Sequence, residues 1–286
     1  MIFLLLQVIF ASAFTLFIKW TQVRGREDVI TVGAINYIVA AVCILPVFLL
    51  KNPMPVSVDA IWTGGTMGVV YFIAFFFAIY AIKSVGAASA TVVSVLSILL
   101  PIAVAAMIWN ERPNLWQTSG IGLALLALLL IGGQTKRAAS AAIESAHSWI
   151  VPVVLFSFFL LCGCSRLAQD TFKHVSQPDQ LPAFLISAFG IAGIASIIML
   201  IQRRRRVLPM EWVFGVSLGL ANILQSHFIL KSLEHYAGFI VFPVTSAGAI
   251  VLTTLVATAL LGERLNKRTC LGITVSVVAL FLLPPN

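Results

Sequence analysis

Charged residues are scarce in this sequence, and acidic residues are the scarcest. The 286 residues include only 10 aspartates and glutamates against 18 lysines and arginines, while 60% of the chain is hydrophobic. A water-soluble domain of this length needs far more polar surface than such a composition supplies. The shortage of charge therefore excludes a soluble protein and predicts a chain that folds largely in lipid.

The motifs of enzymes and ATP-driven pumps are missing as well. No His-Glu-x-x-His, Gly-x-Ser-x-Gly or glycine-rich phosphate loop occurs, and all ten acidic residues fall at expected helix ends or in gaps between apolar runs. The sequence thus favours a protein without enzymatic activity, cofactor or metal, and it gives no support to proton exchange at a carboxylate in the middle of the membrane. Its few cysteines lie in apolar runs, so we expect free, buried thiols.

What the sequence does contain is a series of apolar runs of about 20 residues, the length that a spanning helix needs. We expect ten spanning helices, at residues 2–19, 30–50, 60–82, 86–109, 115–133, 148–166, 180–201, 211–231, 236–261 and 268–284. The longest gap, 134–147, falls near the middle of the chain, where a linker between two halves is expected.

The two halves resemble one another at a fixed offset. A shift of 152 positions places Glu111-Arg112-Pro113-Asn114 on Glu263-Arg264-Leu265-Asn266, and Gly120 on Gly272. Matches of scarce charged residues carry weight in so apolar a chain, and an internal repeat indicates a duplicated architecture. We therefore expect two domains, 1–134 and 148–286. Five helices per copy is an odd number, so the copies take opposite orientations, as in inverted-repeat transporters whose substrate site lies between the copies.

The basic residues predict the orientation in the membrane. Gaps after odd-numbered helices hold thirteen lysines and arginines, and gaps after even-numbered helices hold five. Because basic residues favour the cytoplasm, both termini should lie outside. The run Arg203 to Arg206 is interpreted as a topology anchor rather than a nucleic-acid site, although it could also attract anionic lipid headgroups.

The segments Asn110-Glu111-Arg112-Pro113-Asn114 and Gly262-Glu263-Arg264-Leu265-Asn266 each lie between two apolar helices, with a glycine nine residues after the glutamate. They resemble the paired signatures of the drug/metabolite transporter superfamily, EamA-like branch, and the resemblance covers essentially the whole chain. It implies an all-α fold of ten helices, built as two inverted five-helix repeats around a central cavity in a bacterial inner membrane. It also implies alternating-access movement of small organic solutes such as amino acids, metabolites or drugs. Members are usually drawn with cytoplasmic termini, in contrast to the charge count.

The most polar stretch inside an expected span lies in the eighth helix. Asn222, Gln225 and Ser226 are spaced at i, i+3 and i+4 and so share a face, with His227 beside it. This face either lines the cavity and hydrogen-bonds the substrate, or it bonds to a neighbouring helix. The sequence leaves the two interpretations open.

Other polar residues complete the candidate sites. Further candidates for substrate binding are Gln7, Lys19, Asn36, Tyr37, Tyr71, Tyr80 and Lys231. The lysines end helices, so they either extend to the membrane surface or hold an anionic substrate group. The two signatures offer a gate or, the interpretation we favour, turn caps with ion pairs at the membrane surface. The residues concerned are Glu111, Arg112, Glu263 and Arg264.

The sequence as a whole predicts a secondary transporter that exports small organic solutes, with solutes and membrane lipids as its partners. With two repeats in one chain, a monomer could form a complete pathway. The alternative is a flippase for lipids or lipid-linked headgroups that uses the same fold, motivated by the basic surface at Arg203 to Arg206.

Overall fold

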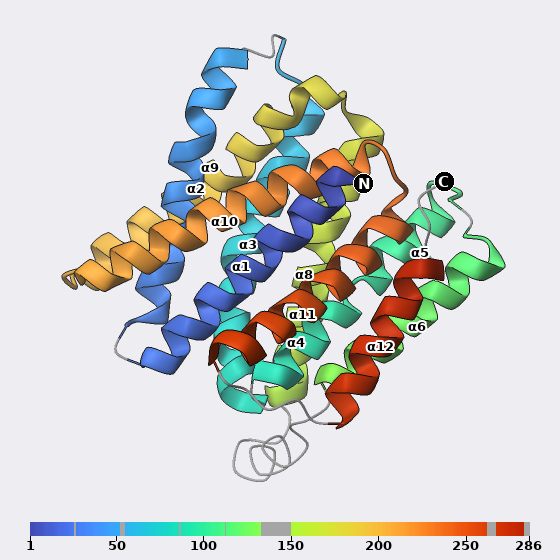
Figure 1. Ribbon diagram of the computed structural model, residues 1–286. Coiled ribbons are helices and arrows are strands. Elements are labelled where there is room, and N and C mark those ends of the chain that lie inside the picture. Colours follow the sequence, from blue (N-terminus) through green and yellow to red (C-terminus); the bar gives the residue numbers. More distant parts are fainter. Residues whose placement is uncertain are drawn as a thin grey trace. The chain divides into compact units, whose positions relative to one another are not determined.

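The described part of the chain is helical and contains no strand. The computed structural model describes residues 1–25, 27–51, 55–85, 87–111, 113–132, 150–261 and 267–282 (Figure 1). The helices are α1 (Ile2–Arg24), α2 (Val29–Lys51), α3 (Val58–Val85), α4 (Ala87–Leu96), α5 (Leu99–Met107), α6 (Leu115–Gly132), α8 (Ile150–Val175), the 3-10 turn η2 (Pro178–Gln180), α9 (Leu181–Arg203), α10 (Pro209–Leu233), α11 (Gly238–Leu261) and α12 (Lys267–Leu282).

Six stretches are long and apolar enough to cross a membrane. Among the described residues these are Val29–Lys51, Val58–Ile82, Ile150–Val175, Pro178–Arg203, Pro209–Leu233 and Gly238–Ala259. Shorter apolar helical segments lie at Ile2–Ile18, Val92–Met107, Leu115–Ala127 and Cys270–Ala279. The predicted all-helical membrane class is thereby confirmed, whereas the count of ten spans stays a prediction.

One helix is longer than the sequence suggested. The span expected at 148–166 runs as α8 from Ile150 to Val175, which places Asp170 inside the helix with no exposed surface. The expectation that every acidic residue lies at a helix end or in a gap was therefore wrong. Polar residues recur every three to four positions between 166 and 174, so the local hydropathy falls although the segment is an amphipathic helix.

The span expected at 86–109 is broken into α4 and α5. The N–H of Ile98 bonds to the carbonyl of Val95, three residues back, and not to that of Ser94, four back. Pro101 has no N–H to donate to Ser97 four residues earlier, so the regular ladder cannot continue through this point. The break leaves the carbonyl of Ser94 without its helical donor.

The expected burial of the cysteines was also wrong. Cys43, Cys162 and Cys164 are partly buried, and Cys270 is exposed. An apolar run in a membrane protein has a face toward lipid as well as a face toward the protein, so hydropathy alone does not predict burial inside the fold.

The chain forms two compact units. Unit 1 comprises Met1–Phe72 and Ala168–His235, and unit 2 comprises Ile73–Leu167 and Tyr236–Asn286. Within unit 1, α10 packs between α1 and α2, and α2 also packs against α9 (Figure 1). Within unit 2, α6 lies beside α12 and also contacts α4 and α11. Each unit draws on both halves of the sequence, and the predicted domains 1–134 and 148–286 stay a prediction.

Glycines set two close helix contacts in unit 1. A Cβ added at Gly219 of α10 would lie 2.8 Å from the carbonyl oxygen of Asn36 in α2. Cβ atoms at Gly64 and Gly68 of α3 would collide with the backbone carbonyls of Phe184 and Ala188 in α9. Small residues let the helix backbones approach in this way. The pairs α2–α10 and α3–α9 are therefore held at backbone contact.

These two pairs run in opposite directions. The helices α2 and α10 begin at the same end of unit 1, because the carboxylate of Glu211 in the first turn of α10 accepts a hydrogen bond from Asp28, just before α2. At the other end, the side chain of Gln180 before α9 accepts a bond from the N–H of Ser57 before α3. The helices α2 and α10 are thus parallel to each other and antiparallel to α3 and α9.

Candidate functional site

Three side-chain amides form a line across the interior of unit 1. The Nδ2 of Asn222 donates to the Oδ1 of Asn36 at 3.1 Å, and the Nε2 of Gln225 donates to the Oδ1 of Asn222 at 3.0 Å. Asn36 and Asn222 are 3% and 4% exposed. We call these three residues the amide chain.

The helix packing places the amide chain. Gly219 lies one turn before Asn222 and brings α10 onto α2 at the level of Asn36. Gln225 follows Asn222 on the same face of α10. The predicted polar face of the eighth helix therefore lies where α10 meets α2, and one of its bonds crosses between the helices.

The amide chain has a donor end and an acceptor end. Within the described part of the structure, the Nδ2 of Asn36 and the Oε1 of Gln225 make no hydrogen bond to protein. An amide nitrogen carries two N–H donors and an amide oxygen has two acceptor sites. The amide chain therefore keeps an amide donor at one end and an amide acceptor at the other that no described residue uses.

A second polar cluster joins α2, α3 and α8 within unit 1. The hydroxyl of Tyr37 donates to the backbone carbonyl of Tyr71 at 3.0 Å, and the Nε2 of Gln169 donates to the Tyr71 hydroxyl at 3.3 Å. The ring of Tyr71 also lies 6.2 Å from that of Phe189, between centroids. Two predicted site residues, Tyr37 and Tyr71, are thus brought together.

Sequence reasoning missed the contribution of α8. Gln169 is 3% exposed and Asp170 is fully buried, both in the part of the helix that had been assigned to a gap. The spacing Arg166, Gln169, Asp170, Lys173 and His174 is a helical polar face, and that periodicity was the signal that could have found them. Ionisable residues inside a membrane span are costly and are commonly functional.

Gln7 lies at the contact of α1 with α10. It is 7% exposed, and its Oε1 is buried without a hydrogen-bond partner in the described residues. Phe3 and Phe10, on the same face of α1, both stack on Phe228 of α10. A buried acceptor without a donor is destabilising, so Gln7 stays a candidate for contact with a polar solute.

The remaining predicted residues lie apart from these hydrogen bonds. The ring of His227 packs against Phe228 at 5.4 Å, and Lys231 forms an ion pair with Glu234 at 2.8 Å at the end of α10. Tyr80, in unit 2, is 44% exposed. The side chain of Lys19 lies outside the described part of the structure. The structure thus brings five of the ten predicted substrate residues, in the amide chain and the tyrosine pair, into two hydrogen-bonded groups.

The first signature segment forms a helix-to-helix turn. Asn110 adopts a left-handed conformation, with φ of 53°, and Asn114 and Gln117 exchange hydrogen bonds with each other's backbone N–H at the start of α6. This is the geometry of helix caps. The gate stays a prediction, and Arg112, Glu263 and Arg264 lie outside the described residues.

Arg166 of α8 binds the break between α4 and α5 in unit 2. Its Nη1 donates to the carbonyl of Ser94 at 2.6 Å and to the hydroxyl of Ser97. The Ser94 carbonyl is the one that lost its helical donor, and a positive charge is stabilised at the C-terminal end of a helix. Ser94 and Ser97 are both hydrogen-bonding partners of this arginine.

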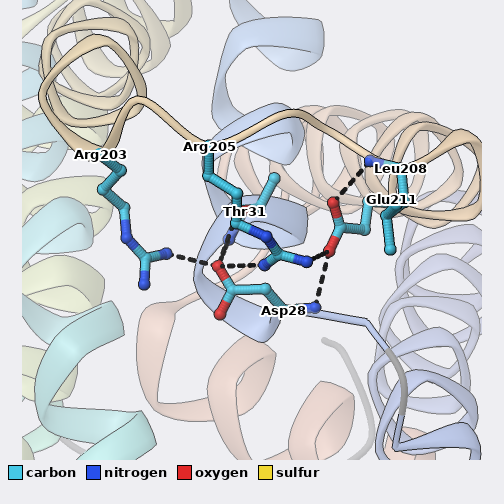
Figure 2. A network of polar contacts seen from close by, with 6 residues as sticks. All are labelled: Asp28, Thr31, Arg203, Arg205, Leu208 and Glu211. Atoms are coloured by element: carbon cyan, nitrogen blue, oxygen red, sulfur yellow. Dashed lines mark hydrogen bonds and ion pairs between the residues drawn. The ribbon is translucent and has the colours of Figure 1, made fainter.

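An ion-pair cluster ties the turn before α2 to the turn before α10. Figure 2 shows Glu211, which is fully buried, between three donors. Its Oε1 accepts from the N–H of Asp28 and from Nη2 of Arg205, and its Oε2 accepts from the N–H of Leu208, each at 2.8 Å. A buried carboxylate needs such partners, because otherwise its desolvation is not compensated.

Asp28 is the second carboxylate of this cluster. Its Oδ2 accepts from Thr31, at the start of α2, and from the guanidinium groups of Arg203 and Arg205. Burial by itself raises the pKa of Asp28, but the bonds from Thr31 and the charge of Arg203 outweigh burial and hold the pKa below its ordinary value. Asp28 is therefore ionised at neutral pH and pairs with both arginines.

The opposite end of unit 1 is tied by the side-chain amide of Gln180. The Oε1 of Gln180 accepts from the N–H of Ser57 at 2.9 Å, and its Nε2 donates to the carbonyl of Pro55 at 3.4 Å. Gln180 lies 152 residues after Asp28, the offset of the predicted repeat. The corresponding positions thus form an ionic tie at one end and an amide tie at the other.

A comparison with protein families gives a match over the first half of the fold. Residues 1–133 match the EamA-like transporter family. This part of the chain is similar to that family, which belongs to the drug/metabolite transporter superfamily. The apolar helices of spanning length and this similarity together indicate a multi-pass membrane protein. The family consists of transporters rather than enzymes, in agreement with the absence of enzyme motifs from the sequence.

The chain is also similar to one protein in sequence and to one solved structure in fold. A protein of Haemophilus influenzae, described as uncharacterized, is 26% identical over 189 residues, which span 65% of this chain and 62% of that protein. The match therefore spans less than two thirds of the relative. A protein of known crystal structure is 16% identical with a TM-score of 0.72, over 99% of this chain and 95% of that chain. At that identity the likeness concerns the fold alone.

Proposed function

We propose that this EamA-like protein is a secondary transporter that exports small polar organic solutes by alternating access, and that the amide chain is part of its solute site. The observation that carries the proposal is the line Asn36, Asn222 and Gln225, whose two ends keep hydrogen-bonding groups that no described residue uses, within an apolar helical bundle. Polar residues at membrane depth are costly, and in transporter folds they mark the path of the solute.

Ten spans in two inverted repeats are part of the proposal, and the helix packing supports them. Gly219 contacts the carbonyl of Asn36 in the pair α10–α2, and Gly68 contacts that of Ala188 in the pair α3–α9. The offsets are 219 − 68 = 151 and 188 − 36 = 152, close to the shift that aligns the two signatures. The two pairs run in opposite directions, as copies of inverted orientation must.

The contact between α2 and α9 gives independent support for the repeat. A Cβ added at Gly193 would lie 3.2 Å from the Cβ of Ala41, and the two positions differ by 193 − 41 = 152. Residues that correspond under the repeat therefore face each other, as expected beside an axis of two-fold pseudosymmetry. The solute site and the central cavity between the copies remain part of this proposal.

The orientation follows from the basic residues. We place the turn with Arg203 to Arg206 in the cytoplasm of a bacterium and both termini outside, since basic residues concentrate on the cytoplasmic side. In a cysteine-free background, a cysteine at Arg206 should resist a membrane-impermeant maleimide in intact cells, and one at Lys51 should react. The reverse pattern would contradict this orientation and agree with cytoplasmic termini.

Flux from proteoliposomes tests the function. Vesicles are loaded with amino acids, sugars, nucleosides and amines, and the loss of each is followed by mass spectrometry against protein-free vesicles. Selective loss of one class of polar solute supports the proposal, whether the reconstituted protein is a monomer or a larger assembly. Movement of fluorescent lipid between leaflets, without loss of any solute from protein shown to be folded, would replace it with the flippase alternative.

A further inference from the structure

Two of the four consecutive arginines are not used by the ion-pair cluster. Arg203 and Arg205 pair with Asp28 and Glu211. Arg204 and Arg206 are exposed and make no hydrogen bond or ion pair through their side chains to the described part of the chain. The run therefore divides alternately into a structural pair and a pair that is available to another molecule.

The backbone explains this alternation. Arg204 ends α9 in a left-handed conformation, with φ of 47° and ψ of 24°, and its N–H bonds to the carbonyl of Ile201. The chain turns there, and Arg203 and Arg205, on either side of it, direct their guanidinium groups to Asp28 (Figure 2). Few residues other than glycine adopt this conformation, so the turn at Arg204 is a defined helix C-cap and not a frayed helix end.

The turn lies where two spanning helices meet the membrane surface. It connects the span that ends at Arg203 to the span that begins at Pro209. Beside it, Ile201 of α9 is 69% exposed and Trp212 of α10 is 49% exposed. Exposed apolar side chains on spanning helices face lipid tails, and tryptophan is enriched at the level of the headgroups. Arg204 and Arg206 are thus placed beside lipid headgroups.

The local charge selects an anion. Arg203 and Arg205 are balanced by the carboxylates of Asp28 and Glu211, whereas Arg204 and Arg206 carry positive charges that no described carboxylate pairs with. Guanidinium groups bind phosphate oxygens through paired hydrogen bonds. The corresponding end of unit 1 near Gln180 is tied by amide groups and has no such pair of arginines in the described residues.

We propose that Arg204 and Arg206 form a binding site for the headgroup of an anionic phospholipid in the leaflet that adjoins this turn. The lipid tails lie along the exposed faces of α9 and α10, and the phosphate lies between the two guanidinium groups. The proposal does not depend on which solute is transported, nor on whether the chain transports one.

Native mass spectrometry of the purified full-length chain tests this site. The protein is mixed in detergent with equal amounts of phosphatidylglycerol and phosphatidylcholine of the same acyl chains, and the ratio of the two adducts is measured. Each basic side chain near an anionic headgroup contributes about fivefold to affinity. The double variant Arg204→Gln/Arg206→Gln should therefore lose about 25-fold of its preference for phosphatidylglycerol, and each single variant about fivefold.

A charge-matched control makes the test specific. Lys51→Gln/Lys267→Gln removes the same two charges from exposed positions elsewhere and should keep the preference. The arginine variant should also keep the wild-type melting temperature, because neither side chain pairs with a described carboxylate. An unchanged preference in the arginine variants, or an equal loss in the lysine control, would overturn the proposal. Displacement of the lipid by an excess of glycerol phosphate would do so too, since the site would then bind free phosphate esters.

Discussion

The side chain of Asn222 in α10 donates a hydrogen bond to the side chain of Asn36 in α2 across the interior of unit 1, at 3.1 Å. Both residues are almost fully buried, and Gln225 extends the line from the same face of α10. The bond joins two helices whose glycine contact leaves no room for larger side chains between them. The same residues therefore serve the packing of the bundle and offer hydrogen-bonding groups to a solute.

Asn222→Ala should destabilise the protein. The substitution leaves the side-chain Oδ1 of Asn36 and the Nε2 of Gln225 without partners. A buried unsatisfied polar group costs about 1–3 kcal/mol. Unfolding in detergent measures the loss. Ser217→Ala is the control on the same helix, because Ser217 is only partly buried and its hydroxyl bonds to the carbonyl of Val213 in its own helix, so it should cost less than about 0.5 kcal/mol. Equal losses in the two variants would contradict the role of the amide chain.

Glu211→Gln should destabilise the protein. Glu211 is fully buried and its carboxylate accepts three hydrogen bonds, one of them from Arg205, so the loss of its charge should cost about 1–3 kcal/mol. The melting temperature in detergent reports this loss. Asp59→Asn is the matched control, since 211 − 59 = 152 and Asp59 is the exposed acid at the corresponding position of α3. If Asp59→Asn lowered the melting temperature as much as Glu211→Gln does, the buried carboxylate of Glu211 would have no special stabilising role.

The ionic tie predicts a pH dependence. Because the pKa of Asp28 is lowered in the folded state, the folded protein binds fewer protons at this group than the unfolded chain does. The stabilisation is fully present above the ordinary carboxyl pKa of about 4 and is lost as the pH falls through the folded value. Between pH 6 and pH 3, the melting temperature of Asp28→Asn should therefore fall less steeply than that of the wild type. Parallel curves would refute this contribution.

Gly68→Ala and Gly219→Ala should both destabilise unit 1. A Cβ at either position meets a backbone carbonyl of the neighbouring helix, and overpacking of this kind costs about 1–3 kcal/mol. Gly190→Ala is the control, because a Cβ there meets nothing within 4 Å. Melting temperatures of the three variants decide the matter. If Gly190→Ala were as harmful as the other two, helix propensity or some other general effect would be responsible instead of the close contacts.

Hydropathy predicted the membrane class and most helix positions, because the cost of burying backbone and charge in lipid depends on composition. It failed at α8, where the polar face containing Gln169 and Asp170 lowers the average although the helix continues to Val175. It also missed the break between α4 and α5, which depends on Pro101 and on the bond from Arg166 to Ser94. Contacts of that kind join residues far apart in the sequence.

The candidate site was predictable only in part. The spacing of Asn222 and Gln225 indicated a shared face, and Asn36 was recognised as a polar residue inside a span. No local pattern linked Asn36 to Asn222, which lie 186 positions apart and meet because glycines bring α2 and α10 together. The ionic tie was missed for the same reason, since the four arginines were interpreted from their charge alone, without partners.

The most direct test is whether variants of the amide chain lower solute flux. The solute class lost from wild-type proteoliposomes is measured with Gln225→Ala, whose side chain lies at the acceptor end, and with Ser217→Ala as control. The account predicts that Gln225→Ala lowers the rate at least about tenfold, through loss of a hydrogen bond to the solute, while folding is retained and the control transports normally. Full transport by folded Gln225→Ala and by Asn222→Ala would contradict it.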